Sequence, residues 1–166
     1  MAKAKYQLED FLAAVEIDDC KGFVAQTHDL LKDSYKLDIK PLAYGLSATY
    51  SQKSTKTGML KFSFTKAGQF VVRIYANNHA KYPDVINGLP DGLKAQIAKS
   101  PICKKAVDPQ KCWDGCNAMY EFYIGEDFYQ KCAYDCFLFE VSVENIPYLR
   151  ALIENETRER GAKNEQ

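Results

Sequence analysis

The stretch LKFSFTKAGQFVVRIY, residues 60–75, decides the fold class because it predicts a β-hairpin. Two runs with alternating apolar residues, Leu60–Thr65 and Gln69–Tyr75, flank a three-residue loop that ends at Gly68. Glycine readily takes the left-handed conformation that such a loop requires at its last position. The chain therefore contains antiparallel β structure.

The register of this hairpin separates a core face from a polar face. The predicted core face carries two cross-strand pairs, Phe64 with Phe70 and Phe62 with Val72. Lys61 lies opposite Arg73 on the other face, where two like charges favour an acidic neighbour or a bound anion. One hypothesis is a shallow ligand site lined by Lys61, Arg73, Tyr75 and Tyr44. The alternative is a pair of solvated side chains whose repulsion is screened by salt.

Amphipathic helices are predicted before and after the strands. Apolar residues recur with a helical period from Leu8 to Val15 and from Phe23 to Leu31. A last helix begins near Asn145, and the charged tail from about residue 154 is expected to fray. These elements predict an α+β fold, an antiparallel β-sheet flanked by N-terminal and C-terminal helices.

The remaining strands are predicted from shorter patterns. Leu42–Tyr50 alternates but contains Gly45 and follows a proline, so one irregular or peripheral strand is expected there. Met119–Ile124 is expected to form a strand pair with a strand from about Cys136 to Val143. The histidines are predicted to be a boundary residue, His28, and an exposed turn residue, His79.

The composition limits the class of protein. The length of 166 residues predicts a single domain (1–166). The balance of 22 Lys+Arg against 22 Asp+Glu gives a net charge of zero, which predicts binding to neither nucleic acid nor a membrane. Residues 1–10 lack the apolar core of a signal peptide, and no apolar run is long enough to span a bilayer. A cytoplasmic location is therefore expected, where thiols stay reduced.

The most informative chemical feature is a cluster of cysteines, C-x8-C-x3-C-x15-C-x3-C, at Cys103, Cys112, Cys116, Cys132 and Cys136. Paired thiols at this spacing are typical of structural zinc sites, which use four ligands. Simple pairing selects the last four cysteines. We favour Cys103, Cys112, Cys116 and Cys132, with Cys136 as the alternate, because Cys136 is predicted to open a strand.

The surroundings of the cysteines suit a metal–thiolate centre. Residues 99–117 are rich in Cys and Lys and lack a regular period, so this loop is expected to be ordered only if something holds it. Lysines at five positions would offset the negative charge of a four-thiolate zinc centre: Lys99, Lys104, Lys105, Lys111 and Lys131.

Other interpretations of the chain stay open. The thiols could be ordinary buried cysteines, or they could act as a redox or metal sensor. An enzyme acting on a small anionic substrate at Lys61 and Arg73 is a further alternative, although no catalytic signature is present. An isolated thiol at Cys20 is expected to be inert. The leading hypothesis is a binding domain with a structural zinc site and a small molecule or a protein as partner.

Several segments resemble the YdhG-like family of small bacterial domains. The similarity lies in FLAAV (11–15), AYG (43–45) and the hairpin end VVRIY (71–75). LPDGLK (89–94) and FLFEV (137–141) resemble uncharacterised bacterial proteins of similar length. The resemblance implies a compact α+β domain, and the cysteine loop departs from the family pattern.

Overall fold

The predicted hairpin is present at the expected register in the computed structural model, which describes residues 5–164. Strand β3 (Gly58–Phe64) pairs with β4 (Phe70–Ile74), and Lys61 lies opposite Arg73. Gly68 has a φ of 80°, the left-handed conformation that the loop requires. The outermost residues of the N-terminal segment and of the charged tail, 1–4 and 165–166, lie outside the described part.

The chain divides into two compact units. Unit 1 contains the chain up to Ile74 together with Glu140–Arg150. Unit 2 contains Tyr75–Phe139 together with the residues from Ala151 onward. Each unit is described separately below.

Unit 1 is built on an antiparallel sheet with the strand order β1-β2-β3-β4-β7. Residues 35–52 form two strands, β1 (Tyr35–Leu42) and β2 (Gly45–Gln52), so the prediction of one irregular strand is wrong. Gly45 has a φ of 119°, which lets the chain reverse between them. Proline is tolerated in β1 because β1 is an edge strand.

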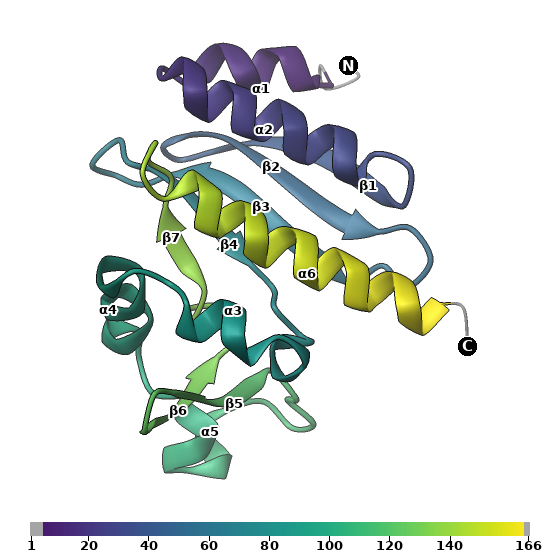
Figure 1. Cartoon of the computed structure of the whole chain (residues 1–166). Coiled ribbons are helices and arrows are strands. Elements are labelled where there is room, and N and C mark those ends of the chain that lie inside the picture. The colour runs from purple at the N-terminus through teal and green to yellow at the C-terminus, as the bar shows by residue number, and fades with distance from the viewer. Residues whose placement is uncertain (1–4, 165–166) are drawn as a thin grey trace. The chain divides into compact units, whose positions relative to one another are not determined.

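Two helices, α1 (Leu8–Ala14) and α2 (Asp18–Leu31), lie side by side and cover the core face of this sheet (Figure 1). The amide of Gln7 donates to the Asp10 carboxylate at 2.7 Å and caps α1. Phe11 from α1 and Phe23 from α2 both contact the ring of Phe62, with centroids 6.4 and 5.8 Å apart. The hairpin phenylalanines are therefore the centre of the core, as predicted.

Unit 2 contains short helices and a second, two-stranded sheet. Its strands are β5 (Met119–Ile124) and β6 (Asp127–Cys132). The predicted partner of β5 is therefore wrong, because the strand beyond Cys136 is β7 (Leu138–Glu140), which joins the larger sheet. The helices are α3 (Pro83–Asn87), α4 (Asp91–Lys99) and α5 (Lys104–Val107), with single turns at His79–Lys81 and Pro109–Lys111.

The last helix, α6 (Ile146–Asn164), extends well beyond the predicted fraying point at residue 154. Glu156 and Arg160 are buried in unit 2 and form an ion pair with an N···O distance of 2.8 Å. Glu156 also accepts hydrogen bonds from Tyr82 and from both nitrogens of Asn78. The tail is helical because Glu156 and Arg160, although charged, are buried in unit 2 and have ion-pair and hydrogen-bond partners there.

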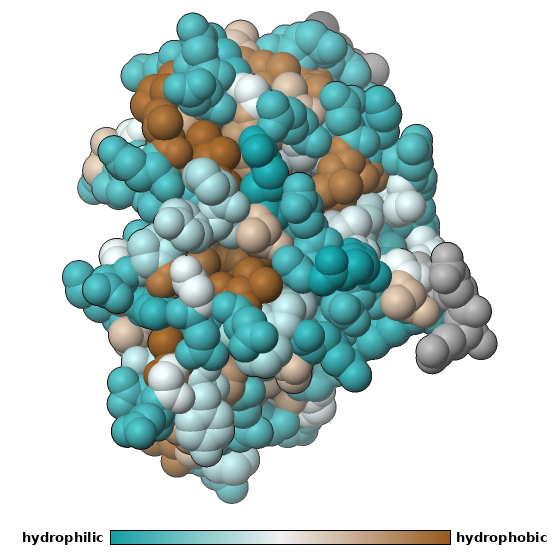
Figure 2. Space-filling model, in the orientation of Figure 1, coloured by the Kyte–Doolittle hydropathy of each residue, from teal (hydrophilic) through white to brown (hydrophobic). Residues whose placement is uncertain are grey.

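Helices and antiparallel strands thus give the α+β fold class that the sequence predicts. Hydrophilic residues cover much of the face shown in Figure 2, and the hydrophobic areas between them are separate from one another. Within residues 5–164, none of the helices has the length and the apolar character needed to cross a bilayer.

Candidate metal and thiol site

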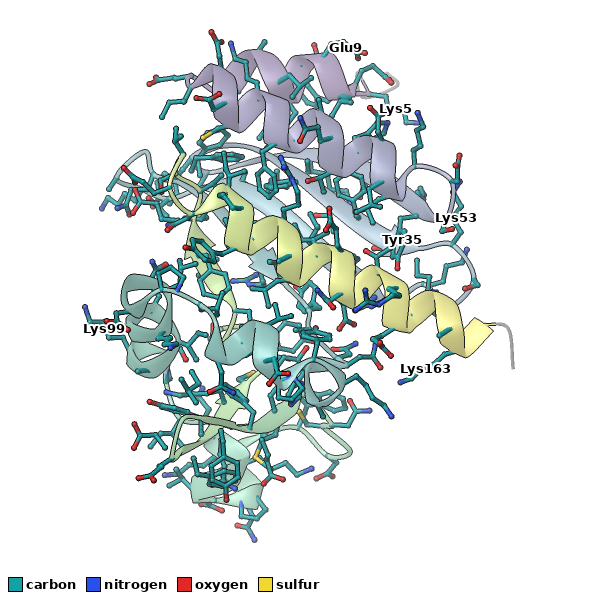
Figure 3. All side chains as sticks on the ribbon, viewed as in Figure 1. Lys5, Glu9, Tyr35, Lys53, Lys99 and Lys163 are labelled. Carbon is teal, nitrogen blue, oxygen red and sulfur yellow. The ribbon has the colours of Figure 1, made fainter. Side chains whose placement is uncertain are left out.

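Three segments of unit 2 bring cysteines to one end of the β5–β6 hairpin. Cys132 ends β6 and lies opposite Met119, the first residue of β5. Cys116 precedes Met119 by three residues, and the amide of Cys103 donates to the carbonyl of Gln130 at 2.9 Å. The backbone alone therefore places Cys103, Cys116 and Cys132 on adjacent segments, and sulfur atoms lie around this hairpin in Figure 3.

The cysteine loop is held by protein contacts. Lys131 is 3% exposed, and its ammonium group donates to the carbonyl oxygens of Ala98 and Ser100. Ile102 forms a β-bridge with Lys131, and Lys105 donates to the carbonyl of Cys116. These contacts explain the order of residues 99–117 without a metal. The Lys131 ammonium group is thus bonded to backbone carbonyl oxygens.

The thiols of Cys103, Cys112, Cys116 and Cys132 interact with one another. A hydrogen bond from the Ala118 amide, then one from Cys112, lowers the pKa of Cys116. The pKa of Cys112 is raised, first by its hydrogen bond with Cys116 and also by the negative charge of Cys103. Burial raises the pKa of Cys132, and the charges of Cys103 and Cys116 add to this shift. Cys103 and Cys116 therefore each affect the pKa of two other thiols, and Cys112 affects that of Cys116.

Backbone amides donate to three of these sulfurs. The amide of Ala118 donates to Cys116, the amide of Tyr134 to Cys132, and the amide of Trp113 to Cys112. For Cys116 and Cys132 the donor lies two residues after the cysteine. Such bonds stabilise the thiolate, which is the form that binds metals and acts as a nucleophile.

Cys136 and Cys20 differ from these four thiols. Cys136 lies in the turn after β6 rather than at the start of a strand, and it is 1% exposed. Burial raises its pKa far above the usual range. In unit 1, Cys20 donates to the carbonyl of Val141 at 3.7 Å, and burial, followed by the charge of Asp19, raises its pKa. Both thiols stay protonated at neutral pH.

The thiol cluster has the donor type of a metal centre, but its side chains are not arranged around an ion. Among residues 5–164, no three or more His, Cys, Asp or Glu side chains are arranged so that they could hold an ion. The donor type and the convergence of the backbone segments fit zinc, which prefers four thiolates. Metal binding would therefore require the side chains of these cysteines to close around the ion.

The cationic pair on the hairpin has the predicted cross-strand position, but the four residues proposed for a ligand site are divided. Lys61 and Arg73 belong to unit 1 and lie on the polar face of the sheet, whereas Tyr75 belongs to unit 2. Tyr44 lines a cavity together with residues of the core face. The register puts Asp38 in the same cross-strand row as Lys61 and Arg73. Asp38 forms an ion pair with Lys40 at 2.6 Å instead.

The two histidines have structural partners. His28 is hydrogen-bonded through Nδ1 to the hydroxyl of Tyr50 at 3.1 Å. His79 contacts the carbonyl oxygens of Ala76 and Glu121 at 2.9 and 3.2 Å and packs against the ring of Tyr120. The prediction that His79 is an exposed turn residue is therefore wrong, because both of its ring nitrogens face the protein.

Comparison with known proteins adds no identification. No protein-family model matches the chain, and no curated protein or solved structure gives a match. The resemblance to the YdhG-like family stays a prediction. The function must therefore be inferred from the geometry described above.

Proposed function

We propose that unit 2 binds a structural zinc ion through Cys103, Cys112, Cys116 and Cys132, within a cytoplasmic binding domain. The observation that carries this proposal is that the backbone brings Cys103, Cys116 and Cys132 onto adjacent segments at the end of the β5–β6 hairpin, with Cys112 hydrogen-bonded to Cys116. Four protein ligands leave no coordination position for water or substrate. The metal would therefore stabilise the loop at residues 99–117 and would not take part in catalysis.

The charge of the surroundings supports this assignment. Zinc with four thiolates carries a net charge of about minus two, which nearby cations offset. The positive charge of Lys105 lowers the pKa of Cys116, and its ammonium group is bonded to the carbonyl of the same residue. We propose a protein or a small molecule as the partner of the domain, and neither nucleic acid nor a membrane.

Metal analysis tests the zinc site. Protein purified without chelator should contain close to one zinc ion per chain, and Co²⁺ substitution should give the visible absorption of a tetrahedral thiolate complex. Replacing Cys103 or Cys132 with serine should abolish both signals. Cys20→Ser is the matched control, because Cys20 lies in the other unit, and it should keep both signals. Less than about 0.1 zinc per chain in the unsubstituted protein would refute the proposal.

The alternate fourth ligand can be separated in the same experiment. Cys136→Ser should keep the zinc content if Cys136 is a buried structural thiol. Loss of zinc and cobalt absorption from folded Cys136→Ser, with retention in Cys103→Ser, would exchange the two assignments. Far-ultraviolet circular dichroism distinguishes loss of metal binding from loss of the fold.

A thiol-based redox function is the second candidate, and the hydrogen bond between Cys112 and Cys116 favours it. With glutathione disulfide as oxidant, the two thiols would form one protein disulfide and two molecules of reduced glutathione. Mass spectrometry of protein incubated with this oxidant should then show a Cys112–Cys116 linkage. Oxidation that is equally fast in the absence and presence of zinc would favour this candidate over the zinc site.

A further inference from the structure

Unit 1 contains a cavity of about 410 Å³ that is independent of the thiol cluster. Its walls come from the link between α1 and α2, the β1–β2 turn, the β3–β4 loop and the end of β7. Pockets of about 300–1,000 Å³ are typical of small-molecule sites. The cavity is therefore large enough for a ligand of modest size.

Aromatic rings form part of the cavity wall. Phe64 and Phe70 are cross-strand neighbours with ring centroids 5.3 Å apart, and both line the cavity. Phe11 packs behind them, with its centroid 6.0 Å from Phe64 and 6.2 Å from Phe70. Tyr44, which is 52% exposed, completes the aromatic lining. The two phenylalanines are thus fixed by the core, while Tyr44 faces solvent.

The charged groups along the cavity wall have one sign. Glu16 and Glu140 line the cavity, and no lysine, arginine or histidine is among the described residues that line it. Glu16 lies in the exposed link between α1 and α2. A carboxylate beside aromatic faces attracts an organic cation, because the ring faces carry partial negative charge. The same field disfavours an anionic ligand.

We propose that this cavity binds a small organic cation, an alkylammonium or arylalkylammonium ion, between the rings of Tyr44, Phe64 and Phe70 and the carboxylate of Glu16. The apolar body of the ligand contacts the phenylalanine rings. Its ammonium group lies toward Tyr44 and the acidic side of the wall. This ligand site shares Tyr44 with the site suggested by the sequence but contains neither Lys61 nor Arg73, which would prefer an anion.

Three probes of similar size and different charge test the charge preference: benzylammonium, benzyl alcohol and benzoate. Each is titrated into ¹⁵N-labelled protein, and binding is followed by amide chemical-shift changes. Benzylammonium should bind at least about fivefold more tightly than benzyl alcohol, and benzoate should be the weakest. The shifts should map to residues 14–17, 44–45 and 68–70. Equal affinity for the three probes, or no shift with benzylammonium at about 10 mM, would overturn the proposal.

Matched variants test the named residues. Glu16→Gln should weaken benzylammonium binding roughly two- to fivefold and leave benzyl alcohol binding unchanged. Glu9→Gln is the control, because Glu9 projects from the outer side of α1 and is not in the cavity wall (Figure 3). Tyr44→Leu should weaken the cation more than the alcohol. If Glu16→Gln and Glu9→Gln behave alike, the assignment of the cation to this cavity is wrong.

Discussion

Replacing Glu156 tests whether the buried charges of α6 hold unit 2 together. The Glu156 carboxylate is fully buried and accepts four hydrogen bonds at 2.6–3.0 Å, from Tyr82, from Arg160 and from both nitrogens of Asn78. Glu156→Leu leaves these donors without their acceptor and leaves the Arg160 guanidinium buried beside an apolar side chain. Breaking a buried pair in this way costs about 3–5 kcal/mol of stability.

Guanidinium unfolding followed by circular dichroism measures this cost. Glu154→Leu is the matched control, because Glu154 lies on the same helix and is exposed. It should change the free energy of unfolding by less than about 0.5 kcal/mol. A loss of less than about 1 kcal/mol for Glu156→Leu would refute the argument, because the substitution removes the buried acceptor of four hydrogen bonds, one of them from a charged group.

A second substitution separates the charge from the lost hydrogen bonds. Adding Arg160→Met to Glu156→Leu removes the buried guanidinium that has lost its ion pair with Glu156, so the double variant should be more stable than Glu156→Leu alone. The bond from Arg160 to the carbonyl of Tyr75 is also lost, which limits the recovery. If the effects of the two substitutions simply add, the guanidinium is not the source of the penalty.

Two further stability predictions follow from unit 1 and from the buried tyrosines. Gly45→Ala should cost about 1–3 kcal/mol of stability, because φ is 119° and the added Cβ would lie 3.2 Å from the ring of Phe64. Gly22→Ala is the control, because Gly22 lies in α2 with open space around it, and it should be neutral or stabilising. Thermal unfolding measures both effects. Burial raises the pKa of three tyrosines, so the unfolded chain loses their protons at lower pH than the folded chain does. Above about pH 10, each of these tyrosines should therefore lower the free energy of unfolding by about 1.4 kcal/mol per pH unit. Unfolding at a series of alkaline pH values measures this slope, and a flat profile would contradict the burial of Tyr50, Tyr82 and Tyr120.

The hairpin could be predicted from sequence because local and tertiary preferences agree there. Alternating phenylalanines and a loop glycine specify one register, and the core uses that register. Strand β6 shows the opposite case. Its most buried residue is Lys131, whose apolar stem is enclosed while its ammonium group satisfies two carbonyl oxygens. A search for alternating apolar residues does not detect such a strand, so the sequence predicts the apolar run after Cys136 as the partner of β5 instead.

The charged end of α6 could have been predicted from its spacing. Leu149 and Ile153 belong to the apolar stripe, and Glu156 and Arg160 follow them by seven residues, on the same face of the helix. Charge normally indicates solvent exposure, so the sequence predicts that the stripe ends at residue 153. The partners that make burial favourable, Asn78 and Tyr82, are distant in sequence and carry no local signal.

The cysteine spacing identified the cluster, but the backbone decides which thiols belong to it. Cys132 and Cys136 are four residues apart, as expected for a pair of metal ligands, yet the turn between them separates their environments. The amide of Cys136 donates to the carbonyl of Cys132, and its side chain is enclosed, whereas the sulfur of Cys132 accepts from the Tyr134 amide. Cys103 has no neighbour at ligand spacing and is brought to the cluster by its bond to Gln130. Our proposal of Cys103 rather than Cys136 as the fourth ligand therefore rests on strand register, which pairwise spacing does not encode.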